Sequence, residues 1–469
     1  MRLRVAAVAV LALCFTLLSA GFADGEQGAP AGACTVQQAD FHGWKAEQIS
    51  NRWTTLIIVP RLGGRLMQVE FGGHPYLFVN PQYYGQYLPP SEGAAKGKWF
   101  NYGGDKDWPL PEGSEDEQHW ASARSDVLDD GEYSLKVISQ GTQCAVQLEG
   151  PADPRTGLQY SRVISLGSNS PRITFHAVMK NITGHPIDWS IQSVSQYDTA
   201  DPRDKSQYNH QFWAFTPVNP NSSYLQRYHV RSGPTDHPSF SIRDGNMFAL
   251  HWKYLEAEVW LDSPAGWVAV VDGLRQYAMV ERFKYQKAEE YPGKASVIFY
   301  LNGARLHLDQ NGMPALRPLN VLDTPYYMEA ELNSPMAHLP AGGTYAFDTE
   351  WFPTRVGENF KTVNDAGLVS NPLTVTQTAG GLKLGGSFGV FYAGHLIAHL
   401  YDREGMPVTD VSLMNVSPLD LINLDKTIQL PPGVAWLSVH LVDADGSDRG
   451  ALGEVHVNPQ ETIQLNEQR

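Results

Sequence analysis

The chain has 469 residues, of which 42% are hydrophobic and 18% charged, and its formal net charge is −15 at pH 7. An acidic chain without basic runs argues against nucleic acid and anionic membrane surfaces as partners. The hydrophobic content predicts a packed globular protein rather than a disordered one, and the length exceeds that of a usual single domain.

The chain begins like a secretory signal peptide. A basic start, MRLR, precedes the apolar run Val5–Leu18 and the small residues that end at Ala23, an order typical of a cleaved export signal. The apolar run is shorter than the roughly 20 residues that span a bilayer, so we expect residues 1–23 to be removed; an uncleaved anchor is the alternative. The sequence therefore predicts a periplasmic or secreted protein without a membrane span after cleavage.

Two cysteines, Cys34 and Cys144, remain after the predicted cleavage site. In an oxidising compartment they could form one disulfide that closes a long loop, and two separate buried thiols are the alternative. Neither paired CxxC motifs nor a Cys/His cluster with zinc spacing is present, and no HExxH motif occurs. We therefore expect neither a metal nor a cofactor.

Short segments with strand character recur along the chain. They are rich in β-branched and aromatic residues, often alternate, and end at Gly, Pro, Asn or Asp. A sustained 3.6-residue periodicity is scarce, so the sequence predicts an all-β chain of packed sheets. The predicted strands lie within Arg52–Leu62, Arg65–Phe71, Tyr133–Ser139, Cys144–Gly150, Arg172–Asn181 and Ala295–Leu301.

A domain boundary is predicted near residues 355–372, where Pro, Gly and Asn interrupt the strand pattern. The main domain would cover residues 36–356. Residues 370–469 hold the strand-like segments Gly389–Gly405 and Val434–Gly446 and predict a small immunoglobulin-like β-sandwich. Within the main domain, residues 80–125 and 198–240 show little strand pattern, and we expect them to form long functional loops.

One of these loops contains NYGGDKDWPLPEG, Asn101–Gly113. The pair Gly103–Gly104 lets the backbone bend and lets a ligand approach closely. The charged triplet Asp105–Asp107 supplies hydrogen-bonding groups and Trp108 supplies a flat apolar face, a combination that suits the hydroxyls and the C–H face of a sugar. The alternative is a surface turn whose tryptophan fills the core.

Two later stretches add polar groups. Glu329 and Glu331 lie two residues apart, so on a strand both carboxylates would face the same side. The segment Trp189–Tyr197 alternates in a way that makes one strand face unusually polar. A lined cleft would explain both patterns, and solvated strand faces would explain them as well.

Together these stretches resemble the galactose-mutarotase-like superfamily, and within it a branch of exported bacterial proteins. The resemblance runs from about Glu47 to Pro353, roughly two-thirds of the chain, and is carried by EQISNRW, LIIVPRLGGRLMQVEFGG, NYGGDKDWPLPEG, NITGHPIDWSIQSVSQYD and MEAELNSPMAHLPAGGTYAFDTEWF. It implies a large antiparallel β-supersandwich with a sugar cleft on one concave sheet.

In the aldose-epimerase members of that superfamily, a glutamate a few residues before a proline acts as base on the anomeric hydroxyl, and Glu331 before Pro335 matches that setting. The acid in those enzymes is a histidine, but here Ser193 or Gln196 occupies its place. A second family histidine would fall within Asn101–Gly104, again without a match. The resemblance thus implies a catalytic or sugar-binding Glu331 and ligand-binding roles for Asn101, Tyr102, Gly103, Gly104, Trp108, Ser193, Gln196 and Asn333.

Ring opening of a sugar needs a proton delivered to the ring oxygen, and general acid–base help is worth roughly 10² to 10⁴ in rate. Since Ser and Gln cannot act as acids near neutral pH, Asp105 or Lys106 would have to do so, with a pKa shifted by burial. Arg65 is a further candidate, because a guanidinium can clamp a carboxylate or hydroxyl; a strand-edge salt bridge is its alternative role.

The sequence therefore predicts an exported carbohydrate-binding protein whose ligand is a mono- or oligosaccharide, with aldose-epimerase-type isomerisation as its candidate activity. Two alternatives stay open. One is a polysaccharide hydrolase or lyase, for which Asp105 and Glu331 could supply the paired carboxylates. The other is a non-catalytic envelope glycan-binding protein. We expect a monomer in each case.

Overall fold

The structure is a computed structural model that describes residues 32–95, 98–113, 118–120, 127–308, 310, 314–316 and 324–457. The predicted signal peptide lies outside these ranges, as does the end of the predicted C-terminal domain. In the part of the chain that is described, no helix is long and apolar enough to cross a membrane.

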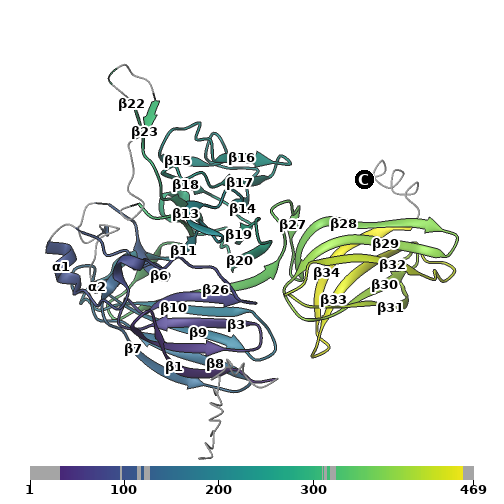
Figure 1. The fold of residues 1–469 in the computed structure, drawn as a ribbon, viewed down its shortest axis with the longest axis horizontal. Coiled ribbons are helices and arrows are strands. Elements are labelled where there is room, and N and C mark those ends of the chain that lie inside the picture. Colours follow the sequence, from purple (N-terminus) through teal and green to yellow (C-terminus); the bar gives the residue numbers. More distant parts are fainter. Residues whose placement is uncertain are drawn as a thin grey trace, which may run out of the picture.

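Two large antiparallel sheets form the body of the chain (Figure 1), which confirms the predicted all-β fold class. The first sheet has the order β1-β2-β3-β4-β6-β11-β24-β21-β18-β15, with β5 paired to β4 and β25 to β11. Its strands are β1 (Thr35–Phe41), β2 (Trp44–Ser50), β3 (Thr54–Val59), β4 (Arg65–Phe71), β5 (His74–Pro75), β6 (Asp105–Leu110), β11 (Ile187–Asp198), β15 (His229–Ser232), β18 (Ala257–Leu261), β21 (Val297–Leu301), β24 (Tyr327–Asn333) and β25 (Ala337–Leu339).

The second sheet has the order β16-β17-β14-β19-β20-β26-β10-β9-β8-β7. Its strands are β7 (Ser134–Ser139), β8 (Gln143–Glu149), β9 (Leu158–Gly167), β10 (Ile173–Asn181), β14 (Phe212–Pro217), β16 (Phe240–Arg243), β17 (Met247–His251), β19 (Trp267–Asp272), β20 (Tyr277–Phe283) and β26 (Thr344–Arg355). Short elements connect the strands: the helices η1 (Pro81–Tyr83), α1 (Pro90–Ala95), α2 (Val127–Asp130) and η2 (Pro292–Lys294), and the strand pairs β12 (Ala200–Asp201) with β13 (Asp204–Tyr208) and β22 (Leu306–Leu308) with β23 (Pro314–Leu316).

The remaining strands build two four-stranded sheets after Arg355, of order β27-β28-β29-β32 and β31-β30-β33-β34. Figure 1 shows them as a separate sandwich beside β26 and β20. The strands are β27 (Thr362–Val363), β28 (Gly367–Thr378), β29 (Gly381–Val390), β30 (Gly394–Tyr401), β31 (Pro407–Val416), β32 (Ile422–Ile428), β33 (Trp436–Asp443) and β34 (Asp448–His456).

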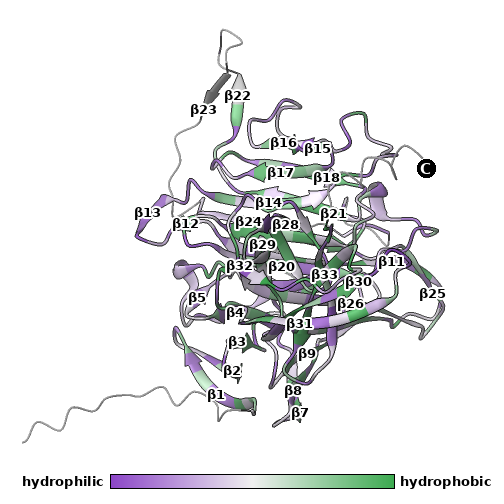
Figure 2. Ribbon diagram, turned by 90° about the vertical axis from the view of Figure 1, so that its right-hand side faces the viewer, coloured by the Kyte–Doolittle hydropathy of each residue, from purple (hydrophilic) through white to green (hydrophobic). Residues whose placement is uncertain are grey.

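The alternation of apolar residues decides how the large sheets pack. Along β10, every second residue from Ile173 to Asn181 is buried, so one face of this strand covers the core and the other is solvated. On β11, all but two of the residues Ile187–Asp198 are buried, because this strand lies in the middle of its sheet. Figure 2 shows hydrophobic residues along many of the strands. Those that are buried between the two large sheets form one core.

A second hydrophobic core joins the second sheet to the C-terminal sandwich. It contains Phe215, Trp267 and Phe352 of the second sheet together with residues such as Phe388 and Phe391 of the sandwich. The rings of Phe352 and Phe391 have their centroids 4.7 Å apart. The C-terminal sandwich therefore covers part of the outer face of the second sheet, at β14, β19 and β26.

A disulfide joins Cys34 and Cys144, whose Cα atoms are 5.9 Å apart, and this decides between the two alternatives for the cysteines. Cys34 immediately precedes β1, the edge strand of the first sheet, and Cys144 lies on β8, next to the edge of the second. The bond thus ties the two large sheets together at one side of the sandwich.

The expectation that residues 80–125 and 198–240 form long loops with little strand is wrong. The motif within residues 80–125 contains strand β6, which pairs with β11 over its whole length, and residues 198–240 contain β12 to β15. Strand character was hidden in β6 because its residues are polar on both faces and Pro109 interrupts the pattern. Elsewhere the predicted segments contain observed strands, and Arg65–Phe71 coincides with β4.

Candidate functional site

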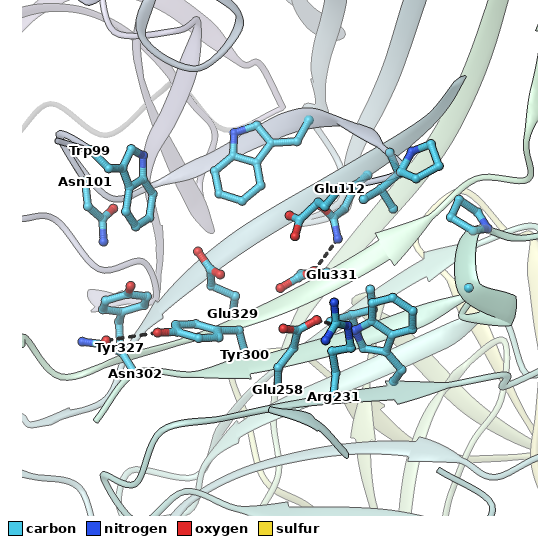
Figure 3. A pocket seen from close by; sticks show the side chains of 18 of the residues that line it. Trp99, Asn101, Glu112, Arg231, Glu258, Tyr300, Asn302, Tyr327, Glu329 and Glu331 are labelled. Carbon is cyan, nitrogen blue, oxygen red and sulfur yellow. Dashed lines mark hydrogen bonds between the residues drawn. The ribbon is translucent and has the colours of Figure 1, made fainter. Parts of the chain in front are cut away.

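A cleft of about 530 Å³ opens on the face of the first sheet that is turned away from the second (Figure 3). Strand register places its central residues in two rows. Glu331 of β24 is opposite Ile298 of β21, which is opposite Trp260 of β18, and Glu329 is likewise in line with Tyr300 and Glu258. Further lining residues include Asn80, Tyr83, Trp99, Asn101, Trp108, Glu112, Gln192, Arg231, Asn302 and Tyr327.

Glu331 lies at the floor of the cleft and is buried. Gln192 of the neighbouring strand donates a hydrogen bond from its amide to the Glu331 carboxylate. Burial first, and then the nearby carboxylates of Glu329, Glu258 and Glu112, raise the pKa of Glu331 well above its ordinary value, and Lys106 opposes them only in part. The protonated acid is therefore favoured at this position.

Glu329, by contrast, has a cationic neighbour. The Gln196 amide donates to its Oε1 at 2.6 Å, and the Lys106 Nζ lies 3.5 Å from the same oxygen. Lys106 is itself almost fully buried and sits 4.3 Å from the centre of the Trp108 ring. Burial lowers the pKa of Lys106, whereas the Glu329 carboxylate raises it. The two adjacent glutamates of β24 thus have different partners, an amide for Glu331 and an amide plus an amine for Glu329.

The aromatic wall of the cleft is fixed from behind by one carboxylate. The indole nitrogens of Trp99 and Trp108 each donate to Asp129 at 2.7 Å. Arg65 donates to the same carboxylate at 2.8 Å and to Asp130 at 3.2 Å, and all three charged side chains are fully buried. Arg65 does not line the cleft, so its predicted contact with a ligand is wrong; it supports Asp129, which holds the two tryptophans.

The alternation along β6 separates Lys106 and Trp108 from the acids beside them. Asp105 and Asp107 point to the opposite face, where Arg162 of the second sheet lies 2.5 Å from Asp105 and 3.3 Å from Asp107. Burial raises the pKa of Asp105 to about 7, although Arg162 opposes the shift. Asp105 is therefore inside the sandwich, and the expectation that it meets Glu331 in the cleft is wrong.

The two glycines of the motif serve the chain's own packing. Gly103 and Gly104 have φ angles of 94° and 77°, a region that favours glycine. A Cβ atom at Gly103 would lie 2.1 Å from the Phe78 carbonyl oxygen, and one at Gly104 would lie 2.8 Å from the Leu66 oxygen. Neither residue lines the cleft, so close approach of backbone to backbone, and not of a ligand, requires them.

The remaining predicted ligand-binding residues divide into two groups. Asn101 lines the cleft. Tyr102 lies behind it, where its hydroxyl accepts a bond from the Leu88 amide at 3.0 Å. Ser193 is on the inner face of β11, opposite Asp107, and Asn333 is fully buried and donates to the Ala295 oxygen at 3.0 Å. Asn101 thus borders the cleft, whereas the other three do not, and neither does Gln196, whose amide binds Glu329.

Sequence reasoning missed the side of the cleft that is formed by residues of β15, β18 and β21. Glu258 accepts a hydrogen bond from the Trp260 indole, and burial raises the pKa of this carboxyl. Arg231 lies at a bulge of β15 where the register shifts. The alternation of Glu258 and Trp260 with buried Val259 and Leu261 was the available signal. None of the residues that line the cleft, as far as the structure describes them, is a histidine.

The protein is thus an all-β sandwich that carries an aromatic, acid-rich cleft on one of its large sheets. No family model and no curated protein matches the chain. Among solved structures, it is similar to a galactose mutarotase-like protein from Clostridium acetobutylicum, with 10% identity over 69% of this chain and 99% of that chain and a TM-score of 0.42. It is also similar to a putative aldose 1-epimerase from Klebsiella pneumoniae, with 13% identity, 69% and 83% coverage and a TM-score of 0.43.

A third similar structure is a TPR-domain containing protein from Parabacteroides distasonis, with 13% identity over 66% of this chain and a TM-score of 0.43; this chain spans 47% of that one. Galactose mutarotase-like proteins are thus among the solved structures that the chain resembles, as its motifs predict. At these TM-scores the likeness does not assign a chemistry, which must come from the residues of the cleft.

Proposed function

We propose that the cleft binds a carbohydrate. The single observation that supports this most strongly is the composition of the rows across the sheet: indole and phenol rings, side-chain amides and carboxylates all border one cavity. Aromatic faces pack against the C–H face of a sugar, and amides and carboxylates pair with hydroxyls that both donate and accept. A volume of about 530 Å³ falls within the roughly 300 to 1,000 Å³ typical of small-molecule pockets, which suits a short saccharide.

The charges narrow the class of saccharide. Glu112, Glu258, Glu329 and Glu331 border the cleft, whereas Arg231 is the cation among the described lining residues. Lys106 lies behind the wall, beside Glu329. With Glu331 in its acid form, the other three acids still outnumber Arg231. An excess of negative charge repels anions, so the ligand is a neutral or positively charged sugar, such as an amino sugar, and not a uronate or a sulfated glycan.

Glu331 makes acid–base chemistry on that sugar the candidate activity. Isomerisation at an anomeric centre needs an acid for the ring oxygen and a base for the O1 proton. Burial raises the pKa of Glu331 and favours its acid form as the donor, while Glu329, whose Oε1 lies 3.5 Å from the Lys106 amine, is placed to accept the proton. A pair of carboxyl groups in different environments is a recurrent way to divide these two roles, and it does not require the histidines that the chain lacks here.

We further propose that the protein is exported. The signal-like residues 1–23 and the Cys34–Cys144 disulfide support this, because disulfides persist in oxidising compartments. Sequencing the N-terminus of protein recovered from the periplasm or medium tests the proposal; an intact Met1 on cytosolic protein would contradict it.

The binding proposal is tested by calorimetry with purified protein and a panel of neutral, amino and acidic saccharides. We expect binding of neutral or amino sugars, a loss of about tenfold or more on Trp108→Ala, and no loss on Trp213→Ala, a half-buried tryptophan of β14 outside the cleft. Silence across the whole panel would overturn it.

For a sugar that binds, NMR exchange between anomers tests isomerisation, with Glu331→Gln as the matched isosteric variant. Faster exchange that Glu331→Gln abolishes, while binding persists, supports the isomerase. Binding without faster exchange leaves a glycan-binding protein, and release of shorter products from a polysaccharide would favour the hydrolase or lyase alternative.

A further inference from the structure

We propose that the C-terminal sandwich binds a divalent transition metal through His399, His440 and Asp448. These residues come from β30, β33 and β34, and one ligand atom from each lies within 4.8 Å of the others. The site is independent of the sugar cleft, which belongs to the first large sheet. Within the described part of the chain, this is the group whose side chains could hold a metal.

The register of the sheet brings the two histidines together. β30 pairs with both β31 and β33, and His399 is opposite Ser438, two residues before His440. Both rings stand on the outer face of the sandwich, since the residues that flank them along each strand are buried. Their centroids are 4.7 Å apart and their planes meet at 87°. Two imidazoles on neighbouring strands thus meet edge to face.

Each imidazole is oriented by a carboxylate. The His399 Nδ1 is 2.7 Å from Asp410 on β31, and the His440 Nδ1 is 2.8 Å from Asp448 on β34. A carboxylate on one ring nitrogen fixes the tautomer, makes the ring more basic and leaves the other nitrogen for a metal. Asp448 is half exposed, so its carboxylate can turn from His440 to the ion and supply the third ligand, which leaves Asp410 as the carboxylate that orients a ring in the metal-bound site.

The donor set selects the metal. Two imidazole nitrogens and one carboxylate oxygen suit Zn²⁺ and its neighbours Co²⁺ and Ni²⁺, whereas Ca²⁺ and Mg²⁺ prefer oxygen ligands alone. The side chains of His399 and His440 are 22% and 20% exposed, so an ion can enter from solvent and keep water in the remaining positions. The alternative to a metal site is that His399–Asp410 and His440–Asp448 are only cross-strand charge pairs. Such pairs would not require the two imidazole rings to be in contact.

The test uses untagged full-length protein, treated with chelator and then titrated with Zn²⁺ by calorimetry and with Co²⁺ by visible absorption. We expect one ion per chain and the intense d–d bands of low-symmetry cobalt. His399→Ala and His440→Ala should each weaken Zn²⁺ binding by about 100-fold, and Asp410→Asn by about tenfold with the stoichiometry unchanged, since it acts through His399.

The controls are His395→Ala and His456→Ala, exposed histidines on β30 and β34 outside the cluster. They should bind Zn²⁺ as the unmodified protein does. If the unmodified protein takes up no metal at micromolar concentrations, or if the controls lose as much affinity as His440→Ala, the proposal is overturned. Should an alanine variant fold poorly without metal, His399→Gln keeps the side-chain volume and gives the same reading.

Discussion

The substitution Asp129→Asn tests how the aromatic wall of the cleft is held. The Asp129 carboxylate accepts Trp99 on Oδ2, and Trp108 and Arg65 on Oδ1. An asparagine keeps one acceptor oxygen, and its amide would face the Trp99 N–H, donor against donor. We therefore expect Trp99 to leave its position while Trp108 keeps its bond.

The magnitude follows from these contacts. One lost hydrogen bond to a charged acceptor costs about 1.5 to 3 kcal/mol. Arg65 also loses a buried counter-ion but keeps Asp130 at 3.2 Å, so the added cost stays below the roughly 3 to 5 kcal/mol of a fully broken buried pair. A total of about 2 to 4 kcal/mol in the free energy of unfolding is expected.

Urea denaturation followed by tryptophan fluorescence measures the loss, and calorimetry with a bound sugar measures the effect on affinity. Glu132→Gln is the matched control, because the Glu132–Arg61 pair at 3.4 Å is largely exposed and such pairs contribute about 1 kcal/mol or less. If Asp129→Asn unfolds at the same urea concentration as Glu132→Gln, the support assigned to this carboxylate is refuted whether or not a sugar binds.

Three further predictions concern the core. Burial raises the pKa of Glu281 to about 8, so the folded state loses stability as the pH rises from about 5 to 8. Glu281→Gln cannot ionise and can still accept from Tyr197, so its free energy of unfolding should rise relative to the original chain by about 1.4 kcal/mol per pH unit in that window. Parallel pH profiles of unfolding for the two proteins would contradict this. Cys34→Ser should lower the free energy of unfolding by about 4 to 5 kcal/mol, with reductant bringing the unmodified protein to the same urea midpoint; an unchanged midpoint would rule out this contribution. Phe352→Ala, in the core shared with the C-terminal sandwich, should cost about 3 to 5 kcal/mol and separate the calorimetric transitions of the two parts; a single unshifted transition would show that this contact does not couple them.

Sequence patterns identified strands where one face or both faces are apolar. Arg65–Phe71 coincides with β4, where six of the seven residues are buried and four, Leu66, Met67, Val69 and Phe71, are apolar. The pattern failed for β6, where Trp108 borders the cleft and Lys106 pairs with Glu329 on one side, while Asp105 and Asp107 meet a buried arginine on the other. A strand that is polar on both faces has no hydrophobic alternation to detect.

The site was predictable only where a resemblance supplied it. Glu331 was singled out by its place before Pro335, and it does border the cleft. Glu258 and Arg231 were missed. They lie near Glu331 because their strands follow β24 in the sheet order β24-β21-β18-β15, and the order of strands in a sheet cannot be read from a local sequence pattern. The pairing of Trp108 with Asp129 was hidden for the same reason, since nothing in a local pattern joins an indole to a carboxylate 21 residues away.

The two faces of strand β6 have different roles, and any change in the length of the strand affects both. Losing one residue between Gly104 and Trp108 would shift its parity, turning an indole toward the guanidinium of Arg162 and a carboxylate toward the ligand. Point substitutions leave the alternation of side chains along β6 intact, whereas an insertion or deletion of one residue in this segment would impair both binding and folding. In any relative that shares this cleft, the spacing from the glycine pair to the tryptophan should therefore stay fixed even where the residues between them differ.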